Sequence, residues 1–107
     1  MSDRAALESL LRASAPNTSH QLRHYLYFPS EGCARKAAAS LRKEGFLTEQ
    51  RLGADGVTWL VLATHRVVPS EELVETVRST MERIAGSLSG EYDGWEAEVA
   101  PPHSSLH

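Results

Sequence analysis

The chain has 107 residues, of which 41% are hydrophobic, and a formal net charge of −3. This length suits one domain with a single core. No apolar run approaches the roughly twenty residues of a membrane-spanning helix, so we expect no membrane segment. The single cysteine, Cys33, excludes an internal disulfide and a cysteine-rich zinc site. The first residues lack a secretory pattern, which predicts a cytoplasmic protein.

Charge is divided unevenly between the two halves of the chain. Residues 1–54 carry eight Lys or Arg and five Asp or Glu, whereas residues 55–107 carry three and nine, giving +3 and −6. The acidic total disfavours a dedicated nucleic-acid binder, which usually shows a basic excess. The asymmetry is typical of proteins with charged partners.

The first predicted elements are a short amphipathic helix over residues 3–13 and a strand over 20–28, joined by a turn-rich connector. The strand alternates with a period of two, which separates two sets of side chains. One face receives Leu22, His24, Leu26 and Phe28, and the other receives Gln21, Arg23, Tyr25 and Tyr27.

A second helix is predicted over residues 31–44. Ser30 is suited to cap its first turn, and Gly45 to close it in a left-handed conformation. Its expected buried face consists of small residues and one leucine, which favour close packing: Ala34, Ala37, Ala38 and Leu41.

Two further strands are expected over residues 46–52 and 57–65, with 53–56 as a tight reversal between them. Strands joined this closely pair as an antiparallel hairpin. The second of them is the most apolar segment of the chain, which predicts a central strand covered at least partly on both faces.

The last predicted elements are a helix to about residue 89 and a strand over 91–99. Ser70 is placed to cap the helix and Gly90 to end it, and Asp93-Gly94 predicts a bulge in the strand. Residues 100–107 have no apolar period and are expected to be disordered.

The predicted order β-α-β-β-α-β describes a ferredoxin-like α+β sandwich. Right-handed crossovers place both helices on one face of a four-stranded antiparallel sheet, with the first and third strands in its centre. We therefore divide the chain into a leading helix and connector (1–19), a ferredoxin-like domain (20–99) and a tail (100–107).

Metal and catalytic chemistry are weakly supported. His24 and His65 fall on strands expected to be adjacent, and His20 is nearby, but the converging short-range spacings of a zinc site are absent. Cys33 in the first turn of a helix, with His24 as a base, is the best nucleophile available. We expect no metal, no cofactor and no enzyme; a small-ligand or enzymatic domain would need a deep pocket lined by His24 or Cys33.

The aromatic residues of the sheet suggest a binding surface instead. Tyr25 and Tyr27 face away from the helices and Trp59 could join them, an arrangement that could stack bases. The acidic final strand would repel phosphates, so direct nucleic-acid binding is disfavoured, although it remains the main alternative. An exposed apolar face usually meets a protein, which could be a partner, a second copy of the chain or the leading helix.

The segment Glu91-Tyr92-Asp93-Gly94-Trp95 resembles the closing strand of the ribonuclease E inhibitor family RraB. Other stretches agree with that family: residues 24–29 of the first strand, Gly45-Phe46, and residues 59–63. The resemblance implies a ferredoxin-like sandwich that binds a ribonuclease of the RNA-degrading machinery and lowers its activity without catalysis. Partner binding would then involve the final strand and the sheet face: Glu91, Tyr92, Asp93, Gly94, Trp95, Tyr25, Tyr27 and Trp59.

Overall fold

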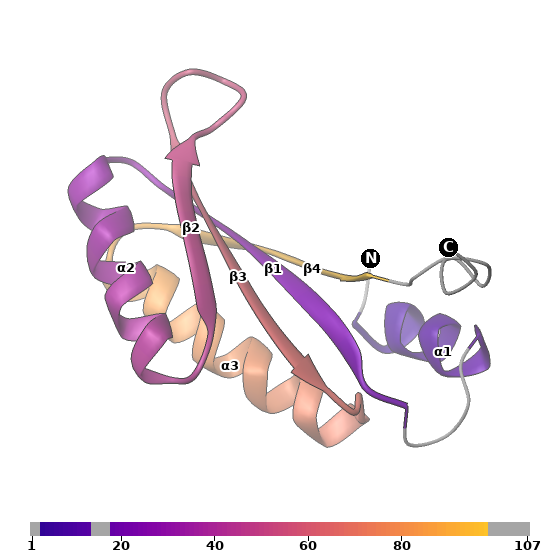
Figure 1. The fold of residues 1–107 in the computed structure, drawn as a ribbon. Helices are drawn as coiled ribbons and strands as arrows, with labels where there is room; N and C mark the ends of the chain where they lie inside the picture. Colours follow the sequence, from indigo (N-terminus) through magenta and orange to yellow (C-terminus); the bar gives the residue numbers. More distant parts are fainter. Residues whose placement is uncertain (1–2, 14–17, 99–107) are drawn as a thin grey trace, which may run out of the picture.

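The computed structural model describes residues 3–13 and 18–98 (Figure 1). The expected connector residues 14–17 and the expected disordered tail 100–107 lie outside this part of the chain. The elements follow the predicted order after one leading helix: α1 (Asp3–Ala13), β1 (His20–Phe28), α2 (Glu31–Lys43), β2 (Leu47–Leu52), β3 (Trp59–Val67), α3 (Glu71–Ser87) and β4 (Glu91–Glu98).

The four strands form one sheet in the order β2-β3-β1-β4, and every neighbouring pair is antiparallel. β1 and β3 occupy the centre, as predicted. Helices α2 and α3 contact each other and pack on one face of this sheet (Figure 1). The ferredoxin-like α+β sandwich predicted from the element order is therefore confirmed.

The core lies between the helices and the sheet because one side of each element is apolar. β1 alternates between buried and half-buried residues along its whole length, as the period of two predicts. In α2 the buried residues are those expected: Ala34, Ala37, Ala38 and Leu41. The small alanines let α2 lie close to the strands.

Helix caps fix where the two packed helices begin. The Ser30 hydroxyl accepts a hydrogen bond from the Cys33 amide at 3.2 Å, and the Ser70 hydroxyl accepts one from the Leu73 amide at 3.1 Å. Each bond satisfies an amide that the first helical turn leaves without a partner. Both predicted N-caps are confirmed.

The leading helix α1 contacts α3 and β4. Its Leu7 and Leu10 side chains are buried. Figure 1 shows α1 beside the end of the sheet rather than across it. The sheet face opposite α2 and α3, called the open face below, is therefore not covered by any helix of the described residues. None of these helices is long and apolar enough to cross a membrane.

The hairpin between β2 and β3 differs from the prediction. The expected reversal over 53–56 is a six-residue loop over 53–58, since Leu52 pairs with Trp59 and β3 begins there rather than at residue 57. The Asp55 carboxylate accepts hydrogen bonds from the amides of Val57 and Thr58, both at 2.9 Å. These bonds hold two β-branched residues in the loop, although their type favours a strand.

The end of α3 also differs in detail. The helix stops at Ser87, and Ser89 rather than Gly90 has the positive φ, of 60°. Gly90 is required for space, because a Cβ there would collide with the ring of Phe28 and the carbonyl oxygen of Tyr27. At the end of α2, by contrast, Gly45 has the predicted left-handed conformation, with φ of 99°.

Candidate functional site

The strand register decides which predicted site residues share a face. Directly paired residues on neighbouring strands point to the same side of a sheet. Tyr25 pairs with Leu62, and Tyr27 pairs with Leu60 and Glu91, so these side chains lie on the open face. Both tyrosines are half-buried. The expected pair of tyrosines on the open face is confirmed.

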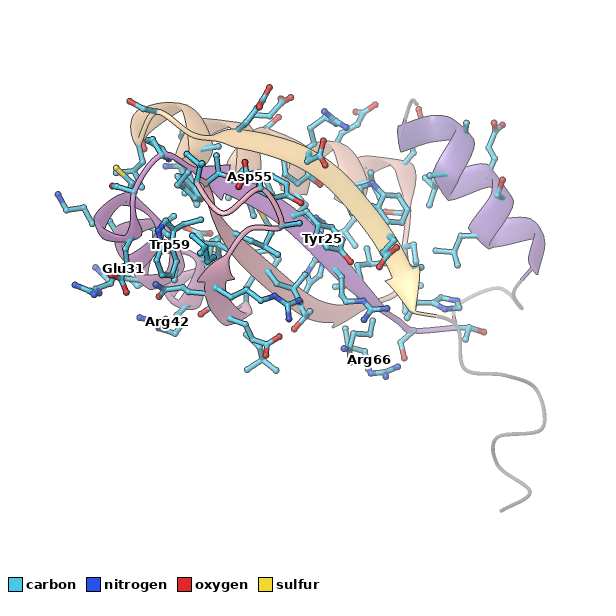
Figure 2. The ribbon with its side chains drawn as sticks, turned by 90° about the horizontal axis from the view of Figure 1, so that it is seen from above. Tyr25, Glu31, Arg42, Asp55, Trp59 and Arg66 are labelled. Atoms are coloured by element: carbon cyan, nitrogen blue, oxygen red, sulfur yellow. The ribbon has the colours of Figure 1, made fainter. Side chains whose placement is uncertain are left out.

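Trp59 does not join these tyrosines, and the prediction that it could is wrong. Trp59 pairs with the buried Phe28 and packs against the core cluster beneath the helices. Figure 2 shows it on the side where the α2 residues Glu31 and Arg42 lie, away from Tyr25. Because β3 is apolar on both faces, its composition does not reveal which face a given residue takes.

The bulge in β4 forms where Asp93-Gly94 predicts it. His24 pairs with Trp95 and Leu26 with Tyr92, so three steps along β4 match two along β1. Gly94 has φ of 100°, a conformation that favours glycine. In a regular strand, residues three apart face opposite sides. The extra residue instead turns both Tyr92 and Trp95 toward the helix face.

Tyr92 and Trp95 are half-buried, and Tyr92 belongs to a hydrogen-bonded chain beneath the sheet. The Tyr92 hydroxyl lies 2.9 Å from Nδ1 of His24, and Nε2 of His24 lies 3.0 Å from Nε2 of His65. The Arg78 guanidinium stands over the Tyr92 ring, 5.4 Å from its centroid. These contacts fix β4 to the central strands and to α3.

The hydrogen bond between His24 and His65 limits how many protons the two imidazole rings can carry. One Nε2 must donate and the other accept, so protonating both would set two N–H groups against each other. His24 is only 2% exposed, and burial lowers the pKa of His65. The two histidines expected on adjacent strands therefore form a part-buried contact between β1 and β3. Within the described residues, no group of three or more His, Cys, Asp or Glu is placed to hold a metal.

A polar cluster crosses the open face from β1 to β4. The Tyr25 hydroxyl donates a hydrogen bond to Oε1 of Glu96 at 2.6 Å, and an Arg23 guanidinium nitrogen lies 3.6 Å from the same oxygen. The hydrogen bond to the Glu96 carboxylate raises the pKa of Tyr25. Glu96 therefore orients an aromatic and a basic side chain on this face.

Hollows lie near both ends of the open face. At one end, a hollow of about 340 Å³ is lined by Tyr27, Glu91 and the hairpin-loop residues Ala54, Asp55 and Thr58. At the other end, a hollow of about 270 Å³ lies among residues of β1, β2 and β3: Gln21, Arg23, Leu47, Thr48, Glu49, Leu62 and Thr64. Leu60 and Leu62, the two leucines of β3 on this face, are each 8% exposed. The open face is therefore more polar at its surface than the strand patterns indicate.

The predicted site residues thus separate into two groups. Tyr25, Tyr27 and Glu91 share the open face, and the exposed Asp93 lies in the bulge with Gly94. Tyr92, Trp95 and Trp59 belong to the helix side. Sequence reasoning did not predict that Asp55 would line a hollow of the open face, although the Asp55-Gly56 pair is a recognisable turn signal. It also missed the Tyr92–His24–His65 chain, which depends on the register of three strands.

Comparison with known proteins tests the family resemblance of the sequence. A search of curated proteins finds none that matches this chain. The family model described as regulator of ribonuclease activity B, RraB, matches residues 1–97. This match covers α1, the whole sheet as far as Ala97, and both packed helices. The chain belongs to the RraB family, the regulators of ribonuclease activity B.

Proposed function

We propose that this protein regulates a ribonuclease by binding it as a protein partner on the open face, at the end where Tyr27, Asp55 and Glu91 meet. The observation that carries the proposal is the hollow of about 340 Å³ shared by these three residues. Tyrosine in a concave site is typical of the residues that dominate protein–protein binding, and the Asp55 and Glu91 carboxylates give this site its charge. The family's ribonuclease connection supplies the class of partner.

A protein partner fits this surface better than RNA does. Glu91 and Glu96 project from β4 on the same face as Tyr25 and Tyr27. Phosphates approaching the tyrosines would meet these carboxylates. Arg23, which could attract a phosphate, is already close to Glu96. The charge arrangement favours a partner surface with basic groups opposite β4.

The proposed mechanism is non-catalytic. His24, the residue best suited by sequence to act as a base, is buried and both of its ring nitrogens face side chains of the core. A general base must reach the proton that it removes. We therefore propose that the protein acts by occupying or distorting the ribonuclease, in the cytoplasm where RNA is degraded.

The decisive experiment measures cleavage of a fluorescently labelled RNA by a purified ribonuclease E-type endoribonuclease, with and without this protein. We expect the wild type to lower the cleavage rate, and the Tyr27→Ala and Glu91→Lys variants to lose most of that effect. Glu72→Lys, an equal charge change on the exposed surface of α3, should behave as wild type. An unchanged cleavage rate with saturating wild-type protein would refute the proposal.

The same proteins test the RNA-binding alternative. A labelled single-stranded RNA should show no retardation at low salt with the wild type. Retardation that declines steeply as salt rises, and that Tyr25→Ala removes, would instead support a nucleic-acid module.

A further inference from the structure

β2 forms one edge of the sheet, and no strand of the described residues pairs with its outer side. Two of its apolar side chains are exposed, Leu47 by 76% and Leu52 by 50%. Helix α2 contacts β2 from the helix side of the sheet, and α1 contacts β4 at the other edge. An uncovered strand edge presents unpaired amides and carbonyls that can pair with another chain.

The hairpin geometry shows which backbone groups of β2 point outward. The Gly53 amide donates to the Thr58 carbonyl at 2.7 Å, so the peptide groups of Gly53 point inward, toward β3. Backbone groups alternate in direction along an antiparallel strand. Those of Leu52, Gln50 and Thr48 therefore point away from the sheet and are available to a further strand.

The side chains around Gln50 are electrostatically self-complementary. Glu49 and Arg51 flank it on the open face, paired with Leu62 and Leu60 of β3. Both are exposed, and neither has an ion-pair partner within residues 3–13 and 18–98. A strand with an acid and a base placed symmetrically about one residue can pair with an antiparallel copy of itself.

We propose that two copies of this chain associate through their β2 edges, antiparallel and centred on Gln50. In this register the two Gln50 residues exchange backbone hydrogen bonds, and Thr48 of each copy pairs with Leu52 of the other. Glu49 then lies directly opposite Arg51 of the second copy, twice by symmetry. Opposite charges in this position stabilise a strand pair.

Neighbouring registers are less favourable. Centring the pair on Glu49 or Arg51 would place like charges opposite each other, which destabilises pairing. It would also bring inward-pointing backbone groups of β2 to the centre of the new ladder. Charge and hydrogen bonding therefore select the same register.

The proposed dimer has one continuous eight-stranded sheet, with both open faces on the same side. If the proposed function holds, a dimer would present two ribonuclease-binding surfaces at once, and a partner with two sites would be held more tightly. The dimer itself does not depend on that function, and its test contains no ribonuclease.

The test is sedimentation equilibrium of the pure full-length chain from about 1 µM to about 1 mM. One strand pair is a small interface, so we expect a dissociation constant of roughly 10–500 µM. Arg51→Glu or Glu49→Arg alone should raise this constant about tenfold or more, because each sets like charges opposite twice. Combining the two substitutions restores complementarity and should return the constant to within about threefold of wild type.

Matched controls separate this edge from general charge effects. Arg83→Glu and Glu75→Arg make the same charge changes on the exposed surface of α3 and should leave association unchanged. Gln50→Pro removes an outward-pointing amide and should abolish the dimer, with the fold checked by circular dichroism. A chain that stays monomeric at about 1 mM, or a double variant that associates no better than the single variants, would overturn the proposal.

Discussion

At the residue scale, the Tyr92 hydroxyl makes a hydrogen bond that one substitution removes. Tyr92→Phe keeps the ring beneath Arg78 but leaves Nδ1 of the buried His24 without this partner. We expect the free energy of unfolding to fall by about 1–2 kcal/mol, measured by urea denaturation. Tyr27→Phe removes a hydroxyl from the open face and should change the free energy of unfolding by less than about 0.5 kcal/mol. Equal effects of the two variants would contradict this role of Tyr92.

His65 makes stability depend on pH. Burial lowers its pKa in the folded protein, so below pH about 6.5 the unfolded chain binds more protons than the folded one. The stabilising effect of neutral His65 is complete above that pH and is lost as pH falls toward the lowered folded value. Urea denaturation from pH 7.5 to 5 should show this decline, and His65→Gln should reduce its slope. An equal slope in the variant would exclude His65 as the cause.

At the scale of elements, two glycines should respond oppositely to alanine. Gly94 holds the β4 bulge with φ of 100°, and alanine there should lower the free energy of unfolding by about 1–2 kcal/mol. Gly86 lies within α3, where an added methyl group would meet only open space. Alanine there should therefore raise the free energy of unfolding by about 0.5 kcal/mol. Thermal unfolding of both variants distinguishes the cases. A neutral Gly94→Ala would show that the bulge does not require glycine.

The same elements show what the sequence could predict. Element order, both N-caps and the bulge follow from local patterns, because alternation, capping residues and an Asp-Gly pair each act within a few positions. The face taken by Trp59 does not, since residues 59–63 are apolar on both sides and the start of β3 depends on Asp55 bonding the loop. The hydrogen-bonding contacts of the His24 side chain with Tyr92 and His65 need the register of strands far apart in the chain. Non-local register therefore limited the prediction of the site more than that of the fold.

At the scale of the whole molecule, the uneven charge of the sequence can be located on the open face. The carboxylates of β4 lie along one side of the open face, at Glu91 and Glu96, whereas Arg51 and Arg66 come from β2 and β3 across it. The overall charge of −3 therefore understates a surface that is acidic along β4 and of mixed charge along β2, where Glu49 lies on the same face as Arg51. Such a surface orients a partner more than it strengthens binding.

Different parts of the molecule determine its stability and its proposed function. Leu7 of α1 is 4% exposed, and α1 packs against α3 and β4 without crossing the open face. Leu7→Ala should therefore lower the free energy of unfolding by about 2–3 kcal/mol, while Glu8→Ala, on the exposed side of the same helix, should change it by less than about 0.5 kcal/mol.

An assay of ribonuclease inhibition distinguishes the packed helix α1 from the hollow on the open face. Measured well below the unfolding midpoint of Leu7→Ala, inhibition should match the wild type, because the hollow between Tyr27, Asp55 and Glu91 is untouched. Tyr27→Ala should show the reverse pattern, with most inhibition lost and a folded chain. A folded Leu7→Ala protein that fails to inhibit would contradict this separation and place part of the binding surface on α1, because loss of stability alone cannot remove activity from a chain that remains folded.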